Sequence, residues 1–442
     1  MSNQLGEQLG FWMLLPFAGI LLCIAILPAV AGRWFSSDRN KAIVATVFGL
    51  PTVVYLLIRF GDLGLHNAGR TAQDYVAFIV LLAALYVISG GIYLTGNLLG
   101  TPRTNVAFLL VGTVLANLIG TTGAAMVLIR PLLRANAERK HATHVVIFFI
   151  FLVCNIGGLL LPVGPPLFLG FLRGVPFFWT LRLWPQWLLA VGLTMIVFLG
   201  LELYHYRREP DSVRLEDEAD YVPMRIAGKL NVLFLAVAVA VIMLSGLLSR
   251  AGDAIHFPFL REVLLLVLMA LSLGFGPRGP RAANEFHWRP LVEVGVLFAG
   301  IFATLIPALA LLEARGAELG LTHAWHYFWT TGGLSAFLDN APAYLAFVAA
   351  AQGQVGAAAA GGLTTALPVA GAAAAPAALL AAISCGAVMM GAITYIGNAP
   401  NLIVKSIAEH SGLKMPSFAA FLAYGAAVLL PVFLVVTLVF FR

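Results

Sequence analysis

Four short segments of this 442-residue chain place helix-breaking Gly or Pro next to oxygen-bearing groups inside otherwise apolar sequence. Carbonyl, hydroxyl, amide and carboxylate oxygens are the hard ligands that small cations prefer. An interrupted helix also presents its positive N-terminal end, which can meet an anion. Each segment could therefore bind an ion or a charged substrate. The segments are GTTG at 120–123, PVGPP at 162–166, DNAP at 339–342 and YIGNAPN at 395–401.

Asp339 gives the sharpest signal, because it is the only acid deep inside an apolar segment. A carboxylate in a membrane interior is costly unless it is neutralised, so we expect Asp339 to bind a cation or a proton. The alternative is a helix-capping aspartate whose oxygens accept backbone amides beside Pro342, and the two roles can coexist. Together with Asn340 and Asn398, Asp339 is predicted to ligate sodium.

Two further charged residues are candidates for an anion contact or a proton relay. Arg130 lies in the sequence MVLIRPLL, where it could meet a substrate carboxylate or pair with Asp339. It could equally extend to the membrane surface, since Arg134 follows one turn later. Glu293 lies shortly after His287 and is expected in the first turn of a helix, where an acid suits the helix dipole.

The elements that carry these residues must lie in a membrane. The chain is 61% hydrophobic and only 10% charged, whereas soluble domains have about 25% charged residues. A bilayer core takes ~20 helical residues, and lipid cannot satisfy open backbone groups, so the spans must be helices. We predict an all-α polytopic membrane protein with about ten transmembrane helices, near 11–31, 42–58, 75–95, 144–164, 184–204, 230–249, 260–276, 291–312, 377–397 and 418–441.

Two further apolar segments, 105–134 and 323–350, are interrupted near their middle and are predicted to be re-entrant hairpins. With both re-entrant, Lys and Arg are roughly twice as frequent on one side of the membrane. This bias predicts a cell inner membrane protein with both termini outside. The net charge of +6 does not indicate nucleic acid, because the basic residues sit in short loops between spans. The three cysteines have no metal-site spacing, and no cofactor is expected.

The chain also reads as two inverted repeats. The stretch VISGGIYLTG precedes one hairpin and broken span, as VLFAGIFATL precedes the other. On the charge bias the two hairpins enter from opposite sides, as in many secondary transporters. The predicted organisation is N-terminal scaffold helices at 1–74, a first repeat at 75–204, a cytoplasmic linker at 205–229, a scaffold helix at 230–259 and a second repeat at 260–442.

The motifs NIGGLLLPVGPP, SAFLDNAP and TYIGNAPNLIVK resemble those of the ion transporter superfamily. GTTGAAMVLIRP together with TYIGNAPN is similar to its citrate transport branch, whose members are commonly labelled sodium:proton antiporters. The resemblance implies a homodimer and an elevator-type movement of a part that carries both hairpins. It implies binding roles for the tip residues Thr121, Thr122, Asp339 and Asn340 and the break residues Asn155, Gly164, Asn398 and Asn401; Gly123, Pro165, Thr394 and Gly397 complete the predicted set.

Divalent-anion symporters of this superfamily carry Ser-Asn-Thr at both tips, whereas this chain has Thr-Thr-Gly and Asp-Asn-Ala. An aspartate at a tip fits sodium/proton exchange, because one carboxylate can bind either ion in turn. We therefore predict a secondary active transporter that exchanges sodium for protons. The alternative is sodium- or proton-coupled transport of citrate or a related carboxylate or oxyanion. A membrane enzyme or channel is disfavoured, because His, Asp and Glu ligands do not cluster in the sequence.

Overall fold

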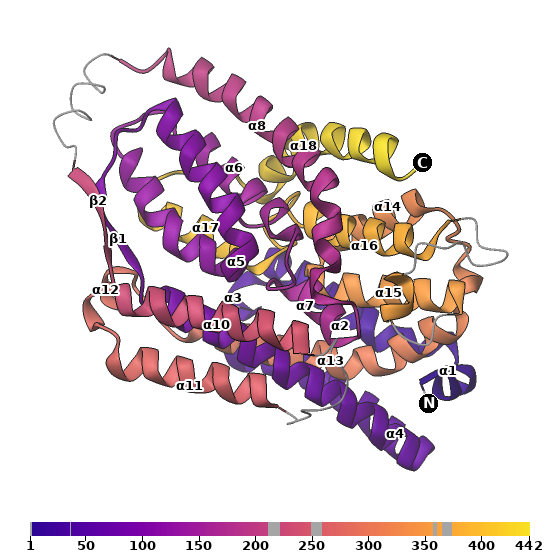
Figure 1. The fold of residues 1–442 in the computed structure, drawn as a ribbon. Coiled ribbons are helices and arrows are strands. Elements are labelled where there is room, and N and C mark those ends of the chain that lie inside the picture. The colour runs from indigo at the N-terminus through magenta and orange to yellow at the C-terminus, as the bar shows by residue number, and fades with distance from the viewer. Residues whose placement is uncertain (1, 36, 211–221, 249–258, 357–359, 365–373) are drawn as a thin grey trace.

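The computed structural model describes residues 2–35, 37–210, 222–248, 259–356, 360–364 and 374–442, which are mostly helical (Figure 1). The middle of the predicted linker 205–229 lies outside the described residues. The first-half helices are α1 (Ser2–Gln8), α2 (Leu15–Val30), α3 (Gly32–Phe35), α4 (Asp38–Gly90), α5 (Pro102–Ala135), α6 (Thr143–Leu152), α7 (Pro165–Leu172) and α8 (Trp184–Tyr206).

The second-half helices are α10 (Lys229–Leu248), α11 (Leu260–Phe275), α12 (Arg278–Ala283), α13 (Arg289–Arg315), α14 (Ala324–Phe337), α15 (Asn340–Val355), α16 (Pro376–Met390), α17 (Ala399–His410) and α18 (Phe418–Phe440). The remaining elements are the 3-10 helices η1 (Phe11–Leu14), η2 (Ile156–Leu159), η3 (Phe177–Leu183), η4 (Gly316–Leu319) and η5 (Ala360–Thr364), and the strands β1 (Tyr93–Asn97) and β2 (Val222–Ala227).

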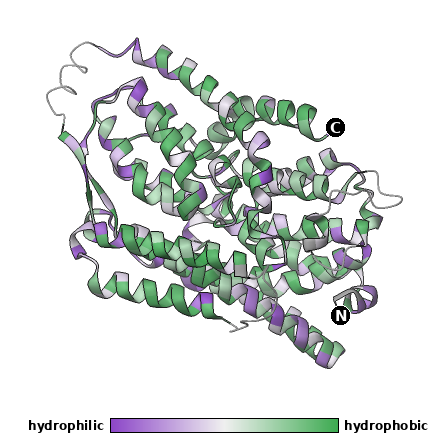
Figure 2. Cartoon of the chain, viewed as in Figure 1, coloured by the Kyte–Doolittle hydropathy of each residue, from purple (hydrophilic) through white to green (hydrophobic). Residues whose placement is uncertain are grey.

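Seven helical segments in the described part of the chain are long and apolar enough to cross a membrane. Figure 2 shows mostly apolar colouring along these helices, and many of their apolar side chains are exposed. Examples are Leu188 and Ile196 on α8, which are exposed although they lie in a long apolar helix. These helices confirm a multi-pass, helical membrane protein. The seven segments are Phe11–Pro28, Asp38–Gly90, Pro102–Ala135, Phe177–Tyr206, Lys229–Leu247, Arg289–Leu319 and Phe418–Phe440.

Helix α4 is a pair of segments that fold back on each other at Gly61, whose backbone (φ 49°, ψ −122°) is not helical. Helix α13 contacts both segments at one level. A Cβ on Gly300 would lie 2.7 Å from the Cα of Ala45, and the ring of Phe298 stacks on Phe78 with centroids 4.9 Å apart. A straight helix would separate Ala45 from Phe78 by about 50 Å. The 53 residues of α4 therefore contain two of the predicted spans.

Helix α5, which covers the first predicted hairpin, is a helical hairpin in the structure. Its helix is interrupted at Gly120, where φ is 75° and ψ is 158°, a conformation that suits glycine. Near its ends, the side-chain amides of Asn105 and Asn136 exchange two hydrogen bonds of 2.9 and 2.7 Å. A straight helix would hold these two residues about 46 Å apart. The two halves of α5 must therefore return alongside each other.

Helices α14 and α15 form the second hairpin, with its tip at Leu338 and Asp339. The rings of Tyr327 on α14 and Phe347 on α15 lie 6.5 Å apart, so these helices also run side by side. Each hairpin is followed by two short helices with an irregular stretch between them. The first stretch runs from 153 to 164, between α6 and α7, and the second from 391 to 398, between α16 and α17.

The prediction of an all-α fold is wrong in one detail, because β1 and β2 pair as an antiparallel ribbon at one edge of the molecule (Figure 1). Thr95 lies opposite Arg225 in this ribbon. The helix expected over 75–95 ends at Gly90, and the residues that follow form β1. The paired glycines at 90 and 91 weaken the helix there, and Tyr93 and Thr95 favour a strand.

The two short helices α6 and α16 form the centre of the protein. Every residue of α6 from His144 to Leu152 is buried, as is every residue of α16 from Leu379 to Met390. Neither helix reaches ~20 residues, the length a bilayer core takes. Other helices enclose both, so the irregular stretches that follow them lie inside the protein rather than in lipid, as an open backbone in a membrane requires.

Candidate functional site

The two irregular stretches meet through a cluster of buried asparagines. The amide of Asn155 donates to Oδ1 of Asn401 at 2.8 Å and to the carbonyl of Ile150 at 2.8 Å. The amide of Asn398 donates to the carbonyl of Cys154 at 2.7 Å. These contacts bring Asn155, Asn398 and Asn401 together from the two halves of the chain. The side chains of Asn155 and Asn398 thereby satisfy backbone carbonyl groups, and the contacts join residues more than 240 positions apart in the sequence.

Thr394 ties the second irregular stretch to the second hairpin. Its Oγ1 donates to the carbonyl of Ala336 and accepts from the backbone amide of Gly397 at 3.1 Å. Gly397 packs closely here, because a Cβ at this position would lie 2.6 Å from the carbonyl oxygen of Gly391 and 2.8 Å from that of Ser335. Thr394 and Gly397 therefore hold the stretch against the second hairpin.

The tip of the first hairpin contacts the first irregular stretch. A Cβ on Gly158 would lie 2.7 Å from the methyl group of Thr121. A cavity of about 20 Å³ lies at this tip, and its lining includes Thr121, Thr122, Gly123 and Pro165. This volume is close to that of a single water molecule. Four residues of the predicted binding set thus share one space that could hold one small ion.

Oγ1 of Thr121 is buried without a hydrogen-bond partner within the described residues. Buried hydroxyl groups in proteins nearly always have a partner, and the described protein atoms supply none here. Gly164, in contrast, has no atom within 4 Å of where a Cβ would lie, and caps the N-terminus of α7 through its backbone alone. Close packing therefore does not require a glycine at position 164.

Asp339 lies at the tip of the second hairpin and caps α15, since its Oδ1 accepts from the backbone amide of Ala341 at 3.2 Å. The capping role considered from the sequence is therefore confirmed. Asp339 makes no ion pair with any described residue. The next residue, Asn340, is almost fully buried, and its Oδ1 has no partner within the described part of the chain. The tip was expected at 339–342, but α15 already begins at Asn340.

Asp339 faces a cavity of about 390 Å³ between the second hairpin and the ends of α4 and α13. Lys41, Arg289 and Glu293 line the same cavity. Ile396 and Ala399, on either side of Asn398, also line it. Asn398 is not among its described lining, because its amide is engaged in the asparagine cluster. The predicted sodium ligands Asp339 and Asn398 therefore do not line the same cavity in the described structure.

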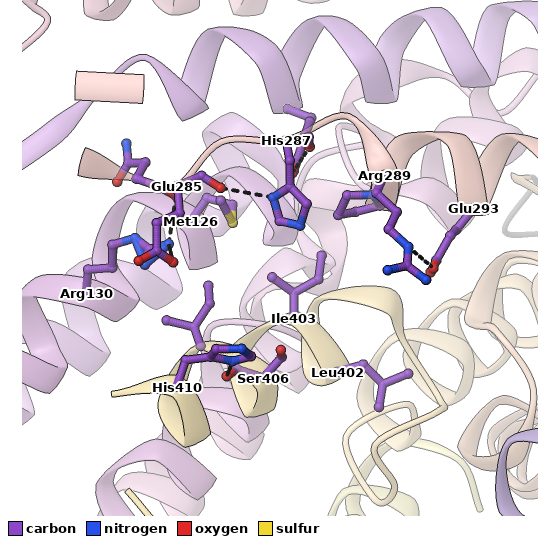
Figure 3. A pocket seen from close by; sticks show the side chains of 14 residues that line it. Met126, Arg130, Glu285, His287, Arg289, Glu293, Leu402, Ile403, Ser406 and His410 are labelled. Atoms are coloured by element: carbon purple, nitrogen blue, oxygen red, sulfur yellow. Dashed lines mark hydrogen bonds and ion pairs between the residues drawn. The ribbon is translucent and has the colours of Figure 1, made fainter. Parts of the chain in front are cut away.

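A second cavity, of about 570 Å³, shares Arg289, Glu293 and Ile403 with the first, so the two are continuous. Figure 3 shows this second cavity with Arg130, Glu285 and His287 on one wall and residues of α17 on the other. Together they form a mostly apolar space with a few charged residues in its walls, which begins at Asp339 and lies between α2, α3, α4, α13 and α5 on one side and α17 on the other.

Basic side chains in these cavities have acidic partners. Nζ of Lys41 lies 2.6 Å from Glu293, and Nε of Arg289 lies 3.4 Å from the same carboxylate. Arg130 lies 3.2 Å from Glu285. Charges in this space are therefore largely neutralised before any substrate arrives.

Two predictions about these residues need correction. Arg130 neither pairs with Asp339 nor extends freely to the surface, because it donates to the carbonyl of Asn284 at 2.7 Å and pairs with Glu285. Glu293 is the fifth residue of α13 rather than a first-turn acid, because the helix begins at Arg289. Its charge is balanced by Lys41 and Arg289 rather than by the helix dipole alone.

A model of the family described as "Putative citrate transport" matches residues 6–441, which is nearly the whole chain. The chain belongs to this family. A search of curated proteins finds no match. Membership of the citrate transport family confirms the resemblance to the ion transporter superfamily, and together with the apolar helices it indicates a membrane transporter rather than an enzyme.

One group of charges in this member of the citrate transport family was missed from the sequence. Glu202 on α8 is fully buried and binds Arg139 with N–O distances of 2.6 and 3.2 Å. His144 and Asn105 also contact its carboxylate, at 2.6 and 2.9 Å. Glu202 lies near the end of an apolar span, a position that indicates a surface acid. Only the fold brings its partners, from α5 and the start of α6, to it.

Proposed function

We propose that this protein is a secondary active transporter that exchanges sodium for protons, with Asp339 as the carboxylate that binds each ion in turn. The observation that carries the proposal is the position of Asp339: it faces an open cavity at a hairpin tip and has one backbone hydrogen bond but no described ionic partner. A carboxylate in such a place is costly unless a cation or proton neutralises it.

The charge balance of the cavities favours a cation over an anion as the species bound there. Arg130 pairs with Glu285, Lys41 with Glu293, and Arg289 with Glu293 and, at 3.9 Å, with Asp38, which leaves Asp339 as a negative charge without a described counter-ion. An anion in the same space would have to displace one of these ion pairs. A proton or a sodium ion at Asp339 displaces none.

The unsatisfied oxygens at the two tips support sodium as the coupling ion. Oγ1 of Thr121 and Oδ1 of Asn340 are both buried and lack partners in the described structure, and both are hard oxygen ligands. Thr121 lines the cavity of about 20 Å³ at the first tip, whose size suits a single ion. In this proposal each tip holds one cation site, and only the second carries an acid.

The movement that the proposal requires is an elevator-type shift of both hairpins and broken helices against the remaining helices. Its support is the location of the two cavities, which separate α17 from α4 and α13. We further propose that the protein is a homodimer of the cell inner membrane and that both hairpins are re-entrant. The inverted repeat and both outside termini belong to the same proposal.

Vesicle transport tests the exchange. Purified protein in proteoliposomes should move protons across the membrane when a sodium gradient is applied, and Asp339→Asn should abolish this movement because an amide cannot take up a proton. Asp62→Asn is the matched control, since Asp62 is an exposed acid away from both cavities. Full exchange by the Asp339→Asn variant would refute the proposal.

Citrate uptake coupled to sodium or protons is the second candidate, and the family description favours it. In this case the carboxylates of citrate would compete with Glu285 and Glu293 for Arg130 and Arg289 in the larger cavity. Radiolabelled citrate uptake into the same vesicles decides between the candidates. Uptake that requires a sodium or proton gradient and is lost in Arg130→Gln would support citrate transport, and sodium/proton exchange without uptake would exclude it.

A further inference from the structure

An apolar groove of about 830 Å³ lies between the first hairpin and α10, away from both cavities described above. One wall is formed by α5: its lining residues before the break at Gly120 recur at the three- and four-residue spacing of one helix face, and Val127 and Leu128 line the groove from the returning half. The facing wall is formed by β1, β2 and the first turns of α10. The lining on α5 comprises Arg103, Thr104, Ala107, Phe108, Val111, Leu115, Ile119, Val127 and Leu128.

The groove is apolar along its length and basic at one end. Arg103 is its only charged lining residue among those described, and Arg103 has no described ion pair. One more exposed cation, Lys229 at the start of α10, lies one turn before Val232, which lines the facing wall at this end. This is the end that the basic-residue bias places at the cytoplasmic surface.

The dimensions and surroundings of the groove suit a lipid tail. From Thr104 to Ile119 the α5 wall rises about 22 Å, which exceeds the roughly 15 Å depth of one leaflet of the hydrocarbon core. Val111 lines the groove, and Val114 on the neighbouring face of α5 is exposed to the same extent, so the groove opens onto a surface that faces lipid. Met224 and Ile226 of the ribbon cover it near the basic end.

We propose that this groove binds one anionic phospholipid, with an acyl chain along α5 and the headgroup phosphate at Arg103 and Lys229. Basic residues beside apolar clefts at the cytoplasmic surface recognise acidic headgroups through charge. The bound lipid would contact both a hairpin and α10. This inference is independent of the ion that the protein transports.

Native mass spectrometry tests the proposal on the full-length protein in detergent. The protein is incubated with equal amounts of phosphatidylglycerol and phosphatidylcholine that carry identical acyl chains, and the retained lipids are counted. One phosphatidylglycerol per chain should be retained at least about fivefold over phosphatidylcholine. Arg103→Gln should make the two lipids equal, whereas Arg278→Gln, which removes an exposed cation outside the groove, should not.

Groove-filling variants separate this site from the general lipid shell. Val111→Trp should remove the retained lipid, whereas Val114→Trp should keep it, because the two valines are 57% and 55% exposed but only Val111 lines the groove. Ala107→Phe fills the groove from an exposed position and serves if Val111→Trp misfolds. Equal retention of both lipids by the unaltered protein, or equal loss in Val111→Trp and Val114→Trp, would overturn the proposal. Loss of a dimer in Val111→Trp without loss of lipid would assign the groove to a second copy.

Discussion

Asp339 illustrates how one side chain can serve structure and function together. Its Oδ1 caps α15 through the amide of Ala341, while the carboxylate as a whole faces the cavity. An asparagine at the same position can keep the cap, because asparagine and aspartate are about equally good N-cap residues. The Asp339→Asn variant therefore separates the charge from the cap, which makes a loss of transport in a stable variant interpretable.

Glu202 is also a buried acid, but its charge is paired with basic side chains, whereas that of Asp339 is not. Replacing it by Gln removes the nearer charge partner of the buried Arg139 and leaves only Glu209, 3.9 Å away, and breaking a buried pair costs about 3–5 kcal/mol. We expect Glu202→Gln to lower the thermal unfolding temperature clearly, and Glu202→Leu combined with Arg139→Met to recover part of the loss. Glu318→Gln is the control, since Glu318 and Arg315 form an exposed pair worth about 0–1 kcal/mol. Equal shifts in the two single variants would contradict this account.

The residues of the candidate site were predictable where their chemistry stands out from apolar surroundings. Asp339, Asn155 and Asn398 are polar residues in membrane segments, and in the structure each lies near other polar groups. The partners were not predictable. Asn155 meets Asn401 across 246 positions, and Glu202 meets Arg139 across 63, so only the packed fold defines these contacts.

At the level of elements, the first hairpin depends on a glycine break and on an asparagine pair that joins its ends. Spin labels on cysteines at Arg103 and Ala137, which are both exposed, test this shape. With Cys23, Cys154 and Cys385 replaced, pulsed electron paramagnetic resonance should give a separation far below the ~51 Å of a straight helix. A separation near the straight-helix value would exclude the hairpin.

The sequence located both hairpins and both irregular stretches because Gly and Pro interrupt the apolar pattern there. It missed the β ribbon, since β1 and β2 lie more than 120 positions apart and a two-stranded ribbon leaves only a weak local signal. The sequence also predicted a first tip of four residues, 120–123, which is longer than the tip in the structure. Gly120 alone leaves the helical region, and Thr121 already belongs to the returning helix.

At the level of the whole molecule, the orientation in the membrane rests on the bias of basic residues. Exposed positions on opposite sides of the predicted topology test it. A membrane-impermeant thiol reagent applied to intact cells should label Asp62→Cys and leave Lys140→Cys unlabelled, and broken cells should label both. Labelling of Lys140→Cys from outside would reverse the orientation or require another crossing between these positions.

The central claim is that one carboxylate, Asp339, binds sodium and a proton in turn. Calorimetric titration of sodium into the purified protein, in two buffers with different protonation enthalpies, gives the number of protons released for each sodium bound. At a pH low enough for Asp339 to carry a proton before sodium is added, we expect the unaltered protein to release about one proton for each sodium bound, because the two ions compete for one group, and we expect no release by Asp339→Asn. Sodium binding without proton release, or equal release by the variant, would contradict it.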